Sequence, residues 1–128
     1  MRLLLDTHAL LWWLAGDDQL SAAAREAISD EENEVFDSAA SAWEVATKHR
    51  IGKLPGAGPL AVDILREIRR QGFVALPISV EHGQAAGSLP GHHRDPFDRM
   101  LIAQARDERL ALVSIERVFD DYGIERVW

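Results

Sequence analysis

The chain has 128 residues, with 14 basic and 21 acidic side chains, a net charge of −7, 47% hydrophobic residues and no cysteine. This length suits one domain over residues 1–128, and the apolar content argues against disorder. The lack of cysteine excludes disulfides, thiolate nucleophiles and cysteine-type zinc sites. No apolar stretch reaches the roughly 20 residues of a membrane helix, and no signal segment precedes the first apolar run, so a cytoplasmic protein with no membrane contact is expected.

The first part of the chain alternates short apolar runs with helical patterns. Residues 3–5 form a continuous apolar run, typical of a strand buried on both faces, which ends abruptly at Asp6. A second strand is expected at 34–36. Trp12 and Trp13 are adjacent and cannot both face one core, so one of them is a candidate for a subunit contact. Helices are expected at 8–14, 21–29 and 38–50.

The remaining sequence continues the alternation. Residues 55–59 (PGAGP) are a turn-rich break, and residues 60–70 are expected to form one amphipathic helix. The later elements are a strand at 73–78 interrupted by Pro77, helices at 80–88 and 96–108, a strand at 110–114, a helical turn at 118–122 and an edge strand at 124–128. This order predicts an α/β sandwich with a mostly parallel sheet.

Residues 92–106 (HHRDPFDRMLIAQAR) open a helix with two carboxylates. Asp95 followed by proline is a good helix start, and an acid at Asp98 suits the helix dipole, so capping is one interpretation of both. Asp98 also lies at helical spacing from Leu101, on the face expected to pack inward. A half-buried carboxylate there needs a cation or several donors. Capping and metal ligation are compatible, and the sequence leaves both open.

Three other acids follow the ends of expected elements. Asp6 lies where an open parallel sheet collects ligands, although it is also placed to cap the next helix. Glu116 follows the 110–114 strand in the same way, with a place in the next helical turn as the alternative. Glu44 completes a capping-box pattern with Ser41 and has Lys48 four residues later, which explains it without a site. Carboxylates are the ligands that Mg²⁺ and Mn²⁺ prefer, so convergence of these acids would create a divalent-metal site.

The net negative charge gives the chain no general attraction for nucleic acid. A polyanionic substrate would need a metal at the acids and basic residues gathered on one face. The basic candidates, each equally explained by a solvated surface, are Lys48, His49, Arg50, Lys53, Arg66, Arg69 and Arg70. His92 and His93 are expected to be loop contacts to a substrate or partner. The chain has no Ser-His-Asp set or glycine-rich phosphate loop, and it lacks the second aspartate of an aspartyl phosphatase, since His8 stands there.

Four stretches carry a resemblance to a known family: residues 3–14 (LLLDTHALLWWL), 38–54 (SAASAWEVATKHRIGKL), 89–105 (LPGHHRDPFDRMLIAQA) and 110–114 (LALVS). Together they resemble the PIN-domain family, specifically VapC-like toxins of bacterial toxin–antitoxin pairs. The resemblance implies a three-layer α/β/α sandwich and a Mg²⁺-dependent endoribonuclease, with Mn²⁺ as an alternative ion. It also implies an RNA substrate, a cognate antitoxin, a homodimer and a toxin–antitoxin hetero-oligomer.

The same resemblance implies a site. Asp6, Glu44 and Asp98 match the family's metal-binding acids, and Asp95 is an additional acid of this motif variant. Glu116 stands where many members have aspartate, so its longer side chain is expected to act as an outer ligand. Asp37 replaces a usual apolar residue, as either a solvated strand end or a further acid near the site. The alternative function is a catalytically silent acidic module that binds an antitoxin or another partner.

Overall fold

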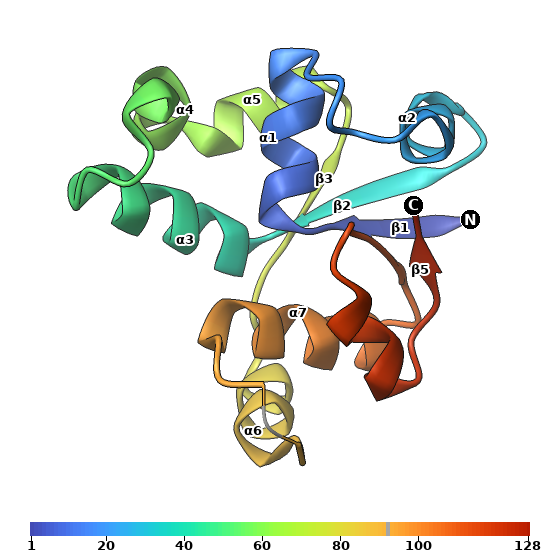
Figure 1. The fold of residues 1–128 in the computed structure, drawn as a ribbon. Coiled ribbons are helices and arrows are strands. Elements are labelled where there is room, and N and C mark those ends of the chain that lie inside the picture. The colour runs from blue at the N-terminus through green and yellow to red at the C-terminus, as the bar shows by residue number, and fades with distance from the viewer. Residues whose placement is uncertain (92) are drawn as a thin grey trace.

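The computed structural model describes residues 1–91 and 93–128, and its centre is a five-stranded sheet in the order β3-β2-β1-β4-β5. Every pairing in this sheet is parallel, which confirms the prediction of a mostly parallel sheet. Since β1 lies in the middle, both of its edges are hydrogen-bonded and its apolar run is buried (Figure 1). The strands are β1 (Arg2–Leu5), β2 (Glu34–Ser38), β3 (Val74–Leu76), β4 (Ala111–Val113) and β5 (Arg126–Val127).

Helices cover both faces of the sheet. Leu3 and Leu5 pack into one hydrophobic cluster and Leu4 into the other, because successive strand residues point to opposite faces. One face carries α1 (Thr7–Ala15), α2 (Ala22–Ser29) and α5 (Ile64–Arg70) (Figure 1). The other carries α7 (Pro96–Asp107) and η2 (Arg117–Tyr122), and α6 (Val80–Ser88) packs against α7 (Figure 1). The expected three-layer α/β/α sandwich is therefore confirmed.

A further helical segment runs outward from the end of β2. It consists of α3 (Ala39–Arg50), η1 (Pro55–Ala57) and α4 (Gly58–Val62). The single helix expected over 60–70 is wrong, because Asp63 adopts φ −149° and ψ 72° and separates α4 from α5. The Asp63 carboxylate accepts a hydrogen bond from the N–H of Arg66 at 3.1 Å, so it starts a new helix instead of continuing the old one. None of the described helices is long and apolar enough to cross a membrane.

The adjacent tryptophans of α1 both pack against the hydrophobic cluster that contains Leu3 and Leu5, so the expectation that they could not face one core is wrong. Trp12 lies between His8 and Trp128, with ring centroids 5.5 and 5.8 Å away, whereas Trp13 donates to the side chain of Gln71 at 3.0 Å. Both are half-buried. The most exposed tryptophan side chain is instead that of Trp43 on α3, at 59%.

Asp37 in β2 is buried inside the protein. It pairs in register with Leu5 on one side and Ala75 on the other, and it is 1% exposed. Neither carboxyl oxygen has a hydrogen-bond partner among the described residues, and burial raises the pKa of Asp37 to about 8. The expectation of a solvated strand end is therefore wrong, because β1 and β3 flank this residue. At neutral pH the side chain is mainly a neutral carboxylic acid.

This burial predicts a pH-dependent stability. The unfolded chain ionises Asp37 above its ordinary pKa of 3.8, whereas the folded chain holds the proton up to about pH 8. The free energy of unfolding therefore falls as pH rises through this window, by at most about 1.4 kcal/mol per pH unit from this residue. Asp37→Asn removes the titration, so its stability relative to the parent should increase steadily towards pH 8, as measured by urea unfolding.

The matched control is Asp18→Asn, which removes an exposed acid and should leave the parent's pH profile unchanged. A stability difference between Asp37→Asn and the parent that stays constant from about pH 5 to about pH 8 would contradict the assignment.

Candidate functional site

Asp6 lies at the point where the strand order reverses between β1 and β4, at the carboxyl edge of the sheet. Its backbone N–H donates to the carbonyl of Val113 at 3.1 Å, and its Oδ1 accepts from the N–H of Ala9 at 2.8 Å, so it caps α1. The residue is 4% exposed. Burial raises the pKa of Asp6 to about 6, although hydrogen bonds from Ser114 and Ala9 oppose the rise, and the charge of Asp98 adds to it. Asp6 is thus a cap and also a buried acid beside a second acid.

The two acids that open α7 have different roles. Asp95 is the N-cap, and its Oδ1 accepts from the N–H groups of Phe97 at 2.9 Å and Asp98 at 3.2 Å. Asp98 is half-buried, and its Oδ2 lies 2.8 Å from Nε2 of His93. Burial raises the pKa of Asp98; the His93 hydrogen bond lowers it, and the charges of Asp95 and Glu44 raise it further. Asp95 therefore caps the helix, while Asp98 faces other carboxylates.

Glu44 lies inside α3 and does not form the predicted capping box with Ser41. Ser38 is the N-cap of this helix, because β2 leads directly into it. Glu44 is 5% exposed, with its Oε1 2.5 Å from the hydroxyl of Thr7 and its Oε2 paired with Lys48. The Thr7 oxygen is also 3.1 Å from the Ser41 hydroxyl, which can donate to it while Thr7 donates to Glu44. No local sequence signal selects Thr7 beyond its position directly after Asp6.

These contacts bring together four carboxylates, which we call the acid cluster: Asp6, Glu44, Asp95 and Asp98. They come from the end of β1, from α3 and from the start of α7, which meet at the carboxyl edge of the sheet (Figure 1). The charge of Asp98 raises the pKa of Asp6, and the charges of Asp95 and Glu44 raise that of Asp98, so the ionised cluster needs a counter-charge. Carboxylate oxygens are hard donors of the kind that Mg²⁺ and Mn²⁺ prefer, although the described side chains do not hold three oxygens of these acids within 4.8 Å of one another.

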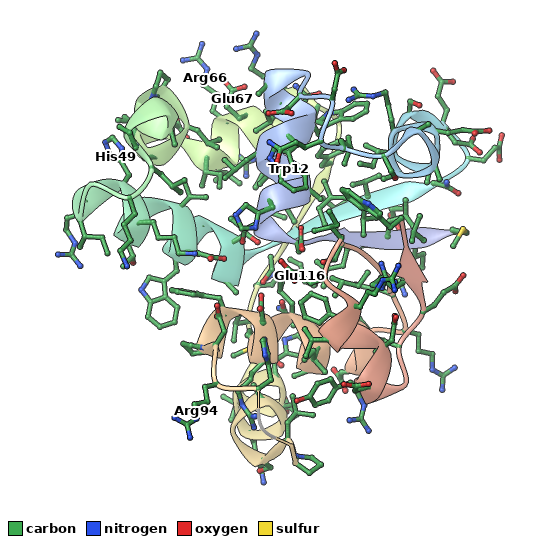
Figure 2. The ribbon with its side chains drawn as sticks, in the orientation of Figure 1. Trp12, His49, Arg66, Glu67, Arg94 and Glu116 are labelled. Carbon is green, nitrogen blue, oxygen red and sulfur yellow. The ribbon has the colours of Figure 1, made fainter. Side chains whose placement is uncertain are left out.

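Glu116 lies at the same edge of the sheet, but its side chain does not contact the acid cluster. It follows β4 at the start of η2, and Figure 2 shows it below the start of α1. Its backbone N–H donates to the Ser114 hydroxyl at 3.0 Å, while its side chain is exposed and makes no hydrogen bond with any described residue. Glu116 is therefore at the rim of the acid cluster and outside its contacts.

The predicted basic residues do not gather around the acids. His49 contacts the carbonyl of Leu54 at 3.1 Å, and Figure 2 shows His49 and Arg66 on the side of the molecule away from α7. Arg94 points outward from the loop before α7 (Figure 2). Among the described lysines and arginines, Lys48 is the one that forms an ion pair with the acid cluster.

The loop before α7 is fixed by the guanidinium of Arg99. This group donates to the carbonyls of Ala86 at 3.1 Å, His93 at 3.0 Å and Leu89 at 2.6 Å. The loop in turn presents the ring of His93 to Asp98, so His93 supports a cluster acid instead of extending to a partner as predicted. The prediction for His92 lies outside the described residues.

A second group of side chains that could bind a metal ion joins α6 to the end of α7. It consists of His82, Asp107 and Glu108. His82 Nε2 is 3.2 Å from Asp107 and 3.0 Å from Glu108, and the backbone N–H of Ser79 donates to Nδ1 at 3.0 Å. Since Nδ1 must accept this bond, the proton of the neutral ring lies on Nε2 and faces the carboxylates. A metal at Nε2 would have to displace that proton and move it to Nδ1, which would break the bond from Ser79 that caps α6. The three side chains therefore serve to connect α6 with α7.

Comparison with known proteins identifies a family and one partial relative. A family model described as the PIN domain matches residues 3–125. Ribonuclease VapC16 of Mycobacterium tuberculosis is 42% identical over 62 residues, which are 48% of this chain and 43% of that protein. The matched region thus spans less than half the length of this relative.

Solved structures show the same fold. VapBC2 from Rickettsia felis, bound to a DNA fragment from its promoter, aligns over all of both chains with a TM-score of 0.71 and 15% identity. VapC20 of M. tuberculosis, a toxin that cleaves the sarcin-ricin loop, covers 95% of both chains with a TM-score of 0.68 and 14% identity. VapBC-1 from nontypeable Haemophilus influenzae covers 98% of this chain and 96% of that chain, with a TM-score of 0.66 and 13% identity.

The Arg99 contacts predict a stability effect. Arg99→Met leaves three carbonyls without their donor, so the free energy of unfolding should fall by about 2–3 kcal/mol in urea titrations. Arg106→Met on the exposed, distal end of the same helix is the control and should change stability by less than about 0.5 kcal/mol. Equal effects of the two substitutions would show that the loop does not depend on Arg99.

Proposed function

The chain belongs to the PIN domain family, and from this premise we propose that its single domain, residues 1–128, is a Mg²⁺-dependent endoribonuclease that acts as the toxin of a toxin–antitoxin pair. The observation that carries the proposal is the acid cluster at the carboxyl edge of the sheet, where the charge of the half-buried Asp98 raises the pKa of the buried Asp6 and the charges of Asp95 and Glu44 raise that of Asp98. The partial identity to a ribonuclease and the fold shared with VapC structures support the same assignment.

In this proposal Asp6, Asp98 and Glu44 hold the metal, with Mn²⁺ as an alternative to Mg²⁺. A divalent ion there would supply Lewis-acid chemistry, by activating water for attack on phosphorus and by neutralising the phosphate. Thr7 fixes Oε1 of Glu44, and His93 fixes Oδ2 of Asp98, so both carboxylates are oriented before a substrate binds. Asp95 fixes the start of α7 and adds negative charge, and Glu116 is an outer ligand at the rim.

A cognate antitoxin is the proposed protein partner. Several of the similar structures are toxin–antitoxin complexes, which supports this choice. The acid cluster is a suitable receptor for an antitoxin arginine, which would compete with the metal. An apolar groove of about 530 Å³ lies between α1 and the segment 53–60, and it is lined in part by Leu11, Trp12, Leu54 and Leu60. This groove could bind an apolar antitoxin segment.

We also propose a homodimer, as part of a larger toxin–antitoxin assembly. Exposed apolar side chains on α3 and α6 support it, since Trp43 is 59% exposed and Val80 is 85% exposed. We further propose that the protein acts in the cytoplasm, where an RNA substrate is available.

Cleavage of RNA by the purified protein tests the proposal. We expect cleavage with Mg²⁺ and none after chelation. Because Asp6 and Asp98 are the direct ligands, Asp6→Asn and Asp98→Asn should each reduce the rate by more than the roughly 10–100-fold typical of outer positions. Glu116→Gln should lose no more than that amount, and the exposed control Asp18→Asn should match the parent. Sequencing the RNA fragments formed after induced expression would identify the target.

Undiminished cleavage by both aspartate variants would reject the assigned site. The alternative function, a silent binding module, would be favoured by three results together. Calorimetry would show no binding of Mg²⁺ or Mn²⁺, the antitoxin would bind tightly, and the parent would not cleave RNA.

A further inference from the structure

Lys48 has a position that the proposed metal site does not explain. Its ammonium is paired with Oε2 of Glu44, four residues earlier on α3, and its side chain remains 31% exposed while that of Glu44 is 6% exposed. The ammonium therefore lies at the boundary between the acid cluster and solvent.

Glu44 does not depend on Lys48 for its orientation. The hydroxyl of Thr7, on α1, lies 2.5 Å from Oε1 and holds the carboxylate from the opposite side. Oε2, the oxygen that pairs with Lys48, receives no hydrogen bond from Thr7 and is the freer oxygen for a divalent ion. A bound metal and the ammonium would therefore meet at the same oxygen, where their like charges repel each other.

A lysine displaced from this oxygen has a natural second partner. Its four-carbon stem is flexible, and its ammonium has three donors that can turn independently of the helix. The protein carries a net charge of −7, and no other described lysine or arginine forms an ion pair with the acid cluster. An RNA phosphate that approaches the cluster therefore meets Lys48 as the one described lysine or arginine that is paired with these acids.

We propose that Lys48 is an RNA-binding residue whose ammonium turns from Glu44 to a non-bridging phosphate oxygen of the RNA strand when the strand reaches the acid cluster. This inference rests on the proposed ribonuclease function. The contact is to the backbone, so it contributes affinity for any RNA sequence and leaves the choice of sequence to other residues.

The test measures RNA binding in an Asp98→Asn background, in which the probe is not cut. The probe is a fluorescein-labelled, single-stranded RNA of mixed sequence, followed by fluorescence anisotropy over a range of salt concentrations with Mg²⁺ present. Adding Lys48→Met should weaken binding about fivefold. It should also reduce the slope of log affinity against log salt by about 0.7, the value for one phosphate contact on a single strand.

Matched variants separate this contact from a general charge effect. Arg106→Met removes one exposed positive charge at the far end of α7 and should leave the salt slope unchanged. Lys48→Arg keeps the charge and should restore the slope. Glu44→Gln frees the ammonium and should tighten RNA binding, and this gain should be smaller when Lys48 is also Met.

Steady-state kinetics of RNA cleavage, measured in the protein that retains Asp98, provide a second test. Lys48→Met should raise KM several-fold with little change in kcat, as expected for loss of a binding contact. Circular dichroism melting shows whether Lys48→Met remains folded, and Lys48→Arg carries the test if it does not.

The outcomes distinguish this inference from the proposed function. A parent that cleaves RNA, with a salt slope unaffected by Lys48→Met, overturns the role of Lys48 and leaves the ribonuclease intact. A slope that falls equally with Arg106→Met overturns it as well. Failure of the parent to cleave RNA, or of the Asp98→Asn protein to bind the probe at low salt, counts against the proposed function itself.

Discussion

The parallel pairing of β1 with both β2 and β4 is the constraint on which the site depends. Parallel strands bring their carboxyl ends to one edge, and the order reverses beside β1, so the chains leaving β1 and β4 diverge at that point. Asp6 is held there by the backbone of β4 and by its cap on α1. The helices α3 and α7 then bring Glu44 and Asp98 to the same edge from distant parts of the sequence.

This arrangement places acids where isolated carboxylates are unfavourable. Asp6 and Asp98 both have raised pKa values, because burial and neighbouring charges disfavour ionisation. Residues beyond the cluster offset part of this cost: Thr7 and Lys48 hold Glu44, and His93 holds Asp98. A divalent ion would meet the remaining demand for positive charge, and only with that ion bound would the cluster attract an anionic phosphate.

Asp37 shows that burial of an acid does not by itself indicate a site. It is more deeply buried than Asp6, at 1% exposure against 4%, and its pKa is raised further. However, burial is the sole cause of its shift, and no acid of the cluster contributes. The mutual influence of several carboxylates, rather than one perturbed pKa, distinguishes the acid cluster from an isolated buried residue.

The sequence by itself determined the alternation of elements, the parallel sheet and the candidate acids Asp6, Asp95 and Asp98, because apolar periodicity and helix-start residues are local signals. Glu116 was a candidate because it follows the 110–114 strand, and the family resemblance selected Glu44, which a capping box could otherwise explain. Only the tertiary structure decided that Glu44 contacts Thr7 and Lys48 while Glu116 remains exposed, that Asp37 is buried, and that His93 meets Asp98. These outcomes depend on which helices approach the carboxyl edge of the sheet. Such contacts join residues far apart in sequence, and no local pattern encodes them.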